Sequence, residues 1–82
     1  MSPIQCRAAR SLLRWTQEDL AKEAEVGIVS VRQFEAETVQ PRRATLAAML
    51  RALEAAGIVF IEQNGGGPGV RLRNPQPSSK QR

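Results

Sequence analysis

The 82-residue chain contains no histidine and no tyrosine, and it has a single cysteine, Cys6. Histidine is the usual general acid–base near neutral pH and a common zinc ligand. Its absence argues against an enzyme, and we expect neither a metal nor another cofactor. One cysteine excludes an internal disulfide, so we expect a reducing, cytoplasmic location.

The chain also lacks a long apolar segment. No run approaches the 18 or more apolar residues of a membrane-spanning helix, and the N-terminus has no apolar signal-peptide core. We therefore expect no membrane partner. A chain of this length buries roughly 60% of the surface that its unfolded form exposes, so its stability is marginal and partner surfaces matter.

The charge that is present is unevenly distributed. The net charge is +4, yet residues 17–40 carry six acidic and two basic side chains, a net of −4. The preceding residues carry +3 and the following residues carry +5. The six acidic residues are Glu18, Asp19, Glu23, Glu25, Glu35 and Glu37. Because duplex DNA binding depends on neutralising phosphates with Lys and Arg, this central segment is poorly suited to DNA.

Capping residues predict a first helix from the N-terminus. Ser2 is a good N-cap, Pro3 suits the first helical position, and Gln5 completes a capping box. The expected apolar face consists of Cys6, Ala9, Leu12 and Leu13.

Three arginines of this helix, Arg7, Arg10 and Arg14, fall close to one stripe. The stripe is either a solvated face or a contact for phosphate or an acidic partner.

A second helix is predicted to begin after the N-cap Thr16, with Trp15 and Leu20 forming a hydrophobic staple. A turn at residues 25–27 then leads into a third helix over residues 28–35. Its expected buried set is Val26, Val31 and Phe34. The residues expected to face outward are Ile28, Val29, Arg32 and Gln33.

A fourth amphipathic helix is predicted after the break at residues 39–41 and ends at Ala56, where Gly57 suits the left-handed position. Arg42 and Arg43 lie at its start, where cations oppose the helix dipole by about 0.3–1 kcal/mol each. This cost points either to an anionic partner nearby or to a solvated pair.

The C-terminal region has a β pattern. Residues 58–61 are apolar and β-branched, residues 64–69 form a turn, and residues 70–73 alternate. A two-stranded hairpin is marginal alone, so it should pack on the helices, pair with a second copy, or both. We expect a mainly α fold: a four-helix helix-turn-helix domain (2–57) with a short β-hairpin or ribbon (58–73). Residues 74–82 are predicted to be a disordered basic tail.

The sequence WTQEDLAKEA at residues 15–24, followed by Val26, Val31, Phe34-Glu35 and Pro41, resembles the lambda-repressor-like (Xre/Cro) helix-turn-helix family over roughly residues 3–56. The end of the chain looks like members that append a β-ribbon. This resemblance implies a dimer that binds operator DNA. It also implies that Gln17 touches the phosphate backbone and that Arg42 and Arg43 lie by the flanking backbone. The residues implied to face the major groove are Ile28, Val29, Arg32 and Gln33.

Three positions depart from the family pattern. Glu25 stands where the turn usually has glycine, Gly27 where a serine often caps the recognition helix, and Glu37 where glycine usually follows it. A glutamate at positive φ costs roughly 1 kcal/mol. Ile28 and Val29 replace polar readers; exposed aliphatics rimmed by acids are typical of a protein-docking surface, although both can also touch thymine methyls.

Two main hypotheses follow, and both are negative control of transcription. The favoured one is an antiactivator that binds and inhibits a partner transcription activator. Its contact centre is Ile28, Val29 and Arg32, with Glu25 and Gln33 at the rim. The alternative is an operator-binding repressor, in which Arg32 and Gln33 read bases. In that alternative the phosphate contacts are Gln17, Arg10, Arg14, Arg42 and Arg43. A third hypothesis, an antitoxin, has least support.

Overall fold

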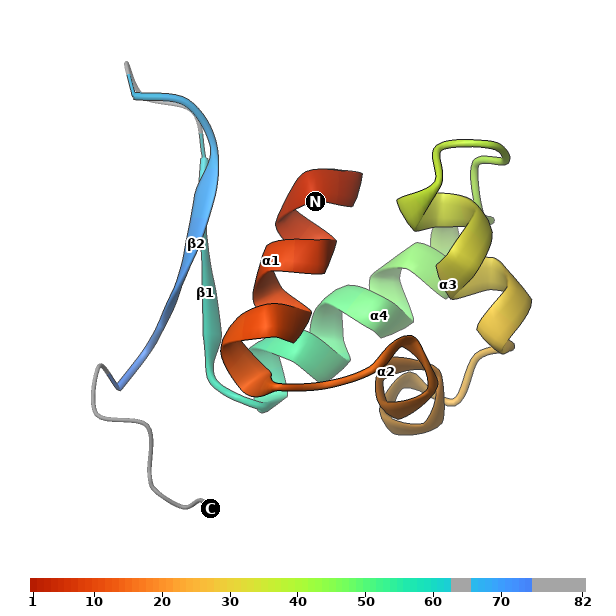
Figure 1. Ribbon diagram of the computed structural model, residues 1–82, viewed down its shortest axis with the longest axis horizontal. Coiled ribbons are helices and arrows are strands. Elements are labelled where there is room, and N and C mark those ends of the chain that lie inside the picture. The colour runs from red at the N-terminus through yellow and green to blue at the C-terminus, as the bar shows by residue number, and fades with distance from the viewer. Residues whose placement is uncertain (63–65, 75–82) are drawn as a thin grey trace.

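The structure is a computed structural model that describes residues 1–62 and 66–74. Within these residues the chain forms four helices followed by a two-stranded antiparallel sheet (Figure 1), which confirms the predicted mainly α fold. The elements are α1 Pro3–Leu13, α2 Gln17–Ala24, α3 Ile28–Glu35, α4 Arg43–Ala55, β1 Ile58–Ile61 and β2 Gly69–Leu72. Part of the predicted turn, at residues 64–65, and the predicted tail beyond residue 74 lie outside the described residues.

Reciprocal side-chain caps fix the beginnings of the first two helices. The Ser2 hydroxyl accepts from the Gln5 backbone N–H at 3.1 Å, and the Gln5 side-chain oxygen accepts from the Ser2 N–H at 2.9 Å. Thr16 and Asp19 make the same exchange at the start of α2, at 3.0 and 2.9 Å. Each box satisfies two backbone donors that a helix start leaves without partners. The N-caps Ser2 and Thr16 confirm the predicted helix starts.

The core lies where the four helices meet. Helix α2 packs against both α3 and α4, while α1 packs against α3 and the second strand. Figure 1 shows α4 running behind α1, with α2 and α3 on one side and the hairpin on the other. The buried apolar residues are Cys6, Ala9, Leu20, Ala21, Val31, Phe34, Met49, Leu53 and Ile58.

The burial of two side chains differs from the prediction: Leu12 was expected in the core, and Ile28 was expected to face solvent. Leu12 is 42% exposed, because it lies one residue, roughly 100°, from Leu13, which packs against the core. Ile28 was expected to face outward, but it is partly buried and packs against the core. It precedes the buried Val31 by three residues and so shares its face of α3.

The hairpin is anchored to the first helix by one amide. The Gln5 Nε2 donates to the carbonyls of Ile61, at 3.4 Å, and Gly69, at 3.0 Å, so it ties the far ends of both strands to α1. At the near end Gly57, at φ +110°, ends α4 as predicted, and its carbonyl accepts from the Arg73 N–H.

The strand register places the apolar side chains of the hairpin on one face. Ile58 pairs with Leu72 and Phe60 pairs with Val70, and all four belong to or pack against the core. The prediction that the hairpin packs on the helices is therefore confirmed. No helix in the described part of the chain has the length and apolar character needed to cross a membrane.

Candidate macromolecule-binding surface

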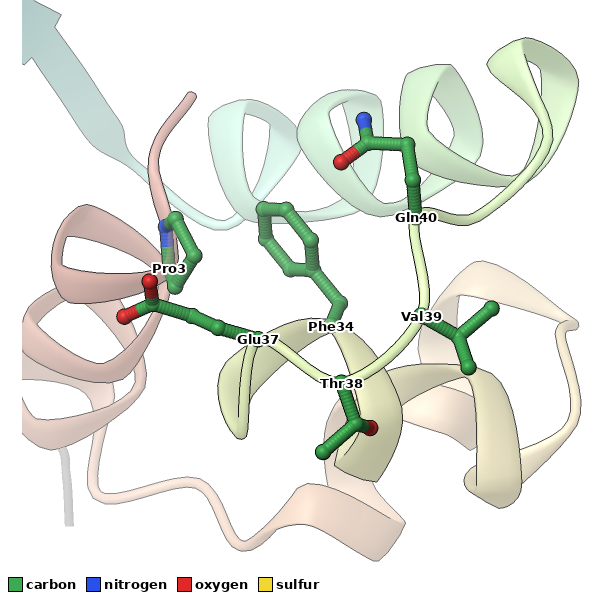
Figure 2. Close-up of a pocket in the computed structure, with 6 residues that line it drawn as sticks. All are labelled: Pro3, Phe34, Glu37, Thr38, Val39 and Gln40. Carbon is green, nitrogen blue, oxygen red and sulfur yellow. The ribbon is translucent and has the colours of Figure 1, made fainter.

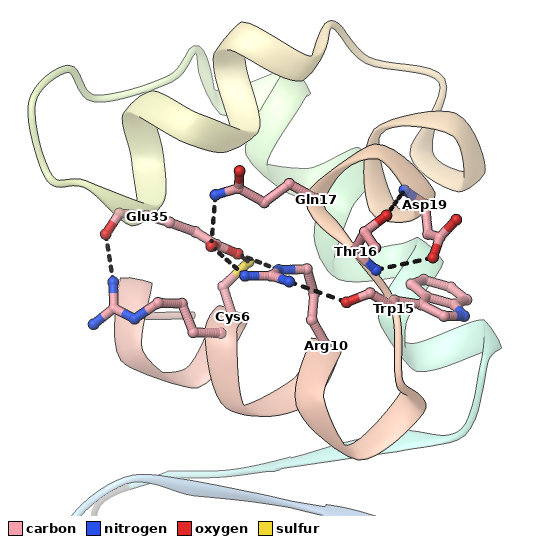
Figure 3. Close-up of polar contacts among 8 residues, drawn as sticks. Cys6, Arg10, Trp15, Thr16, Gln17, Asp19 and Glu35 are labelled. Carbon is pink, nitrogen blue, oxygen red and sulfur yellow. Dashed lines mark hydrogen bonds and ion pairs between the residues drawn. The ribbon is translucent and has the colours of Figure 1, made fainter.

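A buried carboxylate joins α1, α2 and α3. Glu35, at the end of α3, is 4% exposed. Arg10 donates to it twice, from Nε to Oε2 and from Nη2 to Oε1, both at 2.7 Å. The Gln17 amide donates to Oε1 at 3.1 Å, and the Cys6 thiol donates to Oε2 at 3.1 Å (Figure 3). Arg7 donates to the Glu35 backbone carbonyl. This arrangement, the Glu35 network, locks the helix-turn-helix onto α1.

The network determines the ionisation of its members. Burial would raise the pKa of Glu35, but the hydrogen bonds from Arg10, Gln17 and Cys6 outweigh burial and hold that pKa below its usual value. Burial, together with the hydrogen bond to Glu35, raises the pKa of the Cys6 thiol. Cys6 is therefore a protonated donor inside the core, which agrees with its predicted core position.

The network changes three expectations from the sequence. Glu35 was counted among the acids of the central segment, but it is buried and neutralised by Arg10. Arg10 and Gln17 are candidate phosphate contacts of the repressor alternative, and both donate hydrogen bonds to Glu35. A periodicity argument identifies the inward position of Glu35, since it follows Val31 by four residues and Ile28 by seven on the inner face of α3.

The outward face of α3 carries one aliphatic, one cation and one amide. Val29 is 56% exposed, Arg32 is exposed, and Gln33 is partly exposed. Spacings of three and four residues place these side chains on the same helical face. The structure therefore brings together three of the four residues of α3 that were predicted to face outward, while Ile28 packs against the core.

Two glutamates with left-handed backbone bracket α3. Glu25 has φ 58° in the turn before the helix, and Glu37 has φ 60° after it. Both are exposed, and both occupy positions where the resembled family usually has glycine. Gly27 is the N-cap of α3 and, as expected for glycine, makes no side-chain cap. Each glutamate costs about 1 kcal/mol in backbone conformation and adds negative charge beside the helix.

The exposed charges of residues 17–40 remain predominantly acidic after Glu35 is excluded. Five acids and two bases are exposed there, a net of −3. The acids are Glu18, Asp19, Glu23, Glu25 and Glu37, and the bases are Lys22 and Arg32. The other predicted cations, Arg14, Arg42 and Arg43, are exposed outside this segment.

A helix-turn-helix family model matches residues 7–56. The chain belongs to this family. The match covers all of α2, α3 and α4 and residues 7–13 of α1, and it confirms the resemblance to lambda-repressor-like, Xre-type regulators. No curated protein matched the chain.

Membership of the family fixes the broad role of this helix-turn-helix protein. The family consists of DNA-binding transcription regulators rather than enzymes. The chain is accordingly a helix-turn-helix transcription regulator.

Proposed function

We propose that this helix-turn-helix protein is an antiactivator: it binds a transcription activator protein through the α2–α3 surface and inhibits it. The observation that carries the proposal is the acidic excess on that surface. Exposed charges of residues 17–40 sum to −3, and each phosphate contact that is missing removes nearly one unit from the salt slope of DNA affinity. A basic protein surface is attracted where a phosphate backbone is repelled.

The composition of the α3 face supports the same proposal. Val29 offers an exposed aliphatic centre, and Arg32 is a residue type that is enriched at protein interfaces. Glu25 and Gln33 form its polar rim. A small apolar centre with a charged rim is the usual anatomy of a protein-docking surface.

The Glu35 network uses one phosphate-binding candidate, Arg10, and this weakens the repressor alternative. Arg10 donates to Glu35 from Nε and Nη2, so releasing it for a phosphate would leave a buried carboxylate with fewer donors. Such loss is expensive in a low-dielectric interior. Gln17 gives only one of its two amide N–H groups to Glu35.

The second candidate is an operator-binding repressor, the function for which the family is known. Arg42 and Arg43 favour it, since both are exposed at the start of α4 and the first turn of that helix contains no acid. Arg14 supplies a further exposed cation on α1. In this alternative Arg32 and Gln33 read the bases.

Affinity capture from the native host separates the two functions. The intact chain should retain a protein and no specific DNA, and Val29→Asp should lose the captured protein. Ile4→Asp is the matched control, because Ile4 is 66% exposed on α1, and it should capture the protein normally. Recovery of a specific DNA fragment, lost in Arg32→Ala with Gln33→Ala, would establish the repressor instead.

We also propose that two copies pair through the C-terminal ribbon. A two-stranded sheet has two open edges, and unpaired strand edges are templates for pairing with another chain. Helical packing covers one face of the hairpin, and among the described residues no further strand pairs with either edge.

A further inference from the structure

A cavity of about 370 Å³ opens between the N-terminus of α1 and the loop that joins α3 to α4 (Figure 2). Its volume is at the lower end of the range for ligand-binding pockets. It is lined by Pro3, Phe34, Glu37, Thr38, Val39 and Gln40. None of these residues belongs to the contact sets of the two functions above.

The cavity has a small apolar floor and one carboxylate. Phe34 is 4% exposed, and Figure 2 shows its ring pointing into the space between Pro3 and Gln40. The Glu37 carboxylate lies beside Pro3 at the edge of the same space. Among residues 1–62 and 66–74 the only ion pair is Arg10–Glu35, so Glu37 makes no ion pair with a described residue.

Hydrogen bonds of the loop hold the backbone of residues 37 and 38 in place. The Glu37 N–H donates to the Phe34 carbonyl at 3.1 Å. The Gln33 carbonyl accepts from both the backbone N–H of Thr38, at 3.0 Å, and its hydroxyl, at 3.3 Å. These bonds close the end of α3 and determine the direction in which residue 37 projects.

We propose that this cavity binds an arginine side chain of the partner protein. A guanidinium forms two parallel hydrogen bonds with a carboxylate, while the aliphatic stem of the arginine packs on apolar surface. Glu37 supplies the carboxylate and Pro3 supplies apolar surface for the stem, with the buried Phe34 beneath. That this arginine belongs to a protein partner rests on the proposed antiactivator function. The exposed side chains of residues 17–40 carry a net charge of −3, which favours a basic partner.

The site is tested by nuclear magnetic resonance titration of the full chain with a blocked tripeptide that has a central arginine. The same peptide with citrulline is the ligand control, because citrulline keeps the shape of arginine and removes its charge. The arginine peptide should move the backbone amide resonances of Thr38, Val39 and Gln40 saturably. The citrulline peptide should bind at least about tenfold more weakly, since a charged hydrogen bond contributes about 1.5–3 kcal/mol.

Two variants locate the binding. Glu37→Gln should lower the affinity of the chain for the arginine peptide by at least about tenfold. Glu23→Gln is the matched control, because Glu23 is also an exposed glutamate of residues 17–40 but belongs to none of the contact sets above, and it should bind the peptide normally. Equal loss in both variants, equal binding of citrulline, or absence of saturable shifts would each overturn the site. Equal binding of a lysine peptide would overturn the guanidinium assignment.

The outcome is distinguishable from that of the proposed function. If Val29→Asp abolishes capture of a protein but the arginine peptide does not bind at Glu37, the cavity inference is wrong and the antiactivator stands. If the peptide binds at Glu37 but the host yields no protein partner, the arginine site stands and its assignment to an activator is wrong.

Discussion

Arg10 of α1 and Glu35 of α3 form a two-bond ion pair, with Nε to Oε2 and Nη2 to Oε1 both at 2.7 Å. The pair lies between α1 and α3, and a third bond, from Arg10 Nη1 to the Trp15 carbonyl at 3.0 Å, ties it to the loop before α2. Glu35 is 4% exposed, so solvent does not substitute for the arginine. The helix-turn-helix is therefore held to α1 by the buried carboxylate of Glu35, which requires the Arg10 guanidinium as its partner.

Removal of Arg10 should be strongly destabilising. Arg10→Met leaves Glu35 buried without its cation, and breaking a buried pair in this way costs about 3–5 kcal/mol. Urea unfolding followed by circular dichroism measures this loss. Arg51→Met, at an exposed position of α4, should change the free energy of unfolding by less than about 0.5 kcal/mol.

If Arg10→Met does not fold, the double variant Arg10→Met with Glu35→Leu keeps the prediction testable. Replacing a whole buried pair with apolar residues is often neutral or stabilising, so the double variant should recover most of the stability. A loss equal to that of Arg10→Met alone would show that the ion pair is not the source of the effect.

The same network predicts the response to acid. The pKa of Glu35 is lowered in the folded state by its hydrogen-bond donors, against the opposing effect of burial. A carboxyl with a depressed folded pKa stabilises the protein above its unfolded pKa, about 4.3 for glutamate. This contribution is lost as the pH falls from there through the folded pKa. Thermal unfolding between pH 7 and pH 2 should show stability falling below about pH 4.3, and Glu35→Gln should flatten that fall. An equally steep fall in Glu35→Gln would contradict the assignment.

Glycine should stabilise the chain at two left-handed positions. Arg14 and Glu25 have φ 59° and 58°, so Arg14→Gly and Glu25→Gly should each raise the free energy of unfolding by about 0.5–1 kcal/mol. Glu23→Gly is the matched control inside α2 and should lower it by about 1 kcal/mol. Thermal melts compare the three, and destabilisation by glycine at residue 14 or 25 would show that the left-handed backbone is not strained.

Local rules predicted the helix ends well, because they depend on a few adjacent residues. Ser2 and Thr16 cap their helices as expected, and α3 spans the predicted residues 28–35. The left-handed Glu25 also follows from its place in a turn that usually requires glycine.

What the sequence did not predict depends on contacts between distant segments. The partners of Glu35 are 18–29 residues away along the chain, and the carbonyls bound by the Gln5 amide are 56 and 64 residues away. A charge count over residues 17–40 assumes that every side chain faces solvent, and tertiary packing removes Glu35 from that count. The cavity beside Glu37 likewise forms only when α1 approaches the α3–α4 loop.

The proposed ribbon dimer predicts a mass that depends on concentration. One chain has a mass of 9.0 kDa, and sedimentation should show a shift toward twice that value as concentration rises. Val59 lies on β1 opposite Arg71, on the face of the hairpin away from Ile58 and Phe60. Val59→Glu places a charge there and should shift the equilibrium from the dimer toward single chains. A single-chain mass at every concentration would remove the dimer.

The central claim is that the α2–α3 surface binds protein and not DNA. The most direct measurement is binding of the purified chain to duplex DNA from its own genetic neighbourhood at about 150 mM salt. We expect no sequence-selective complex, and only weak, salt-sensitive association through the exposed arginines outside residues 17–40. A selective complex with a dissociation constant of roughly 10⁻⁸ M or tighter, lost in Arg32→Ala with Gln33→Ala, would contradict the claim.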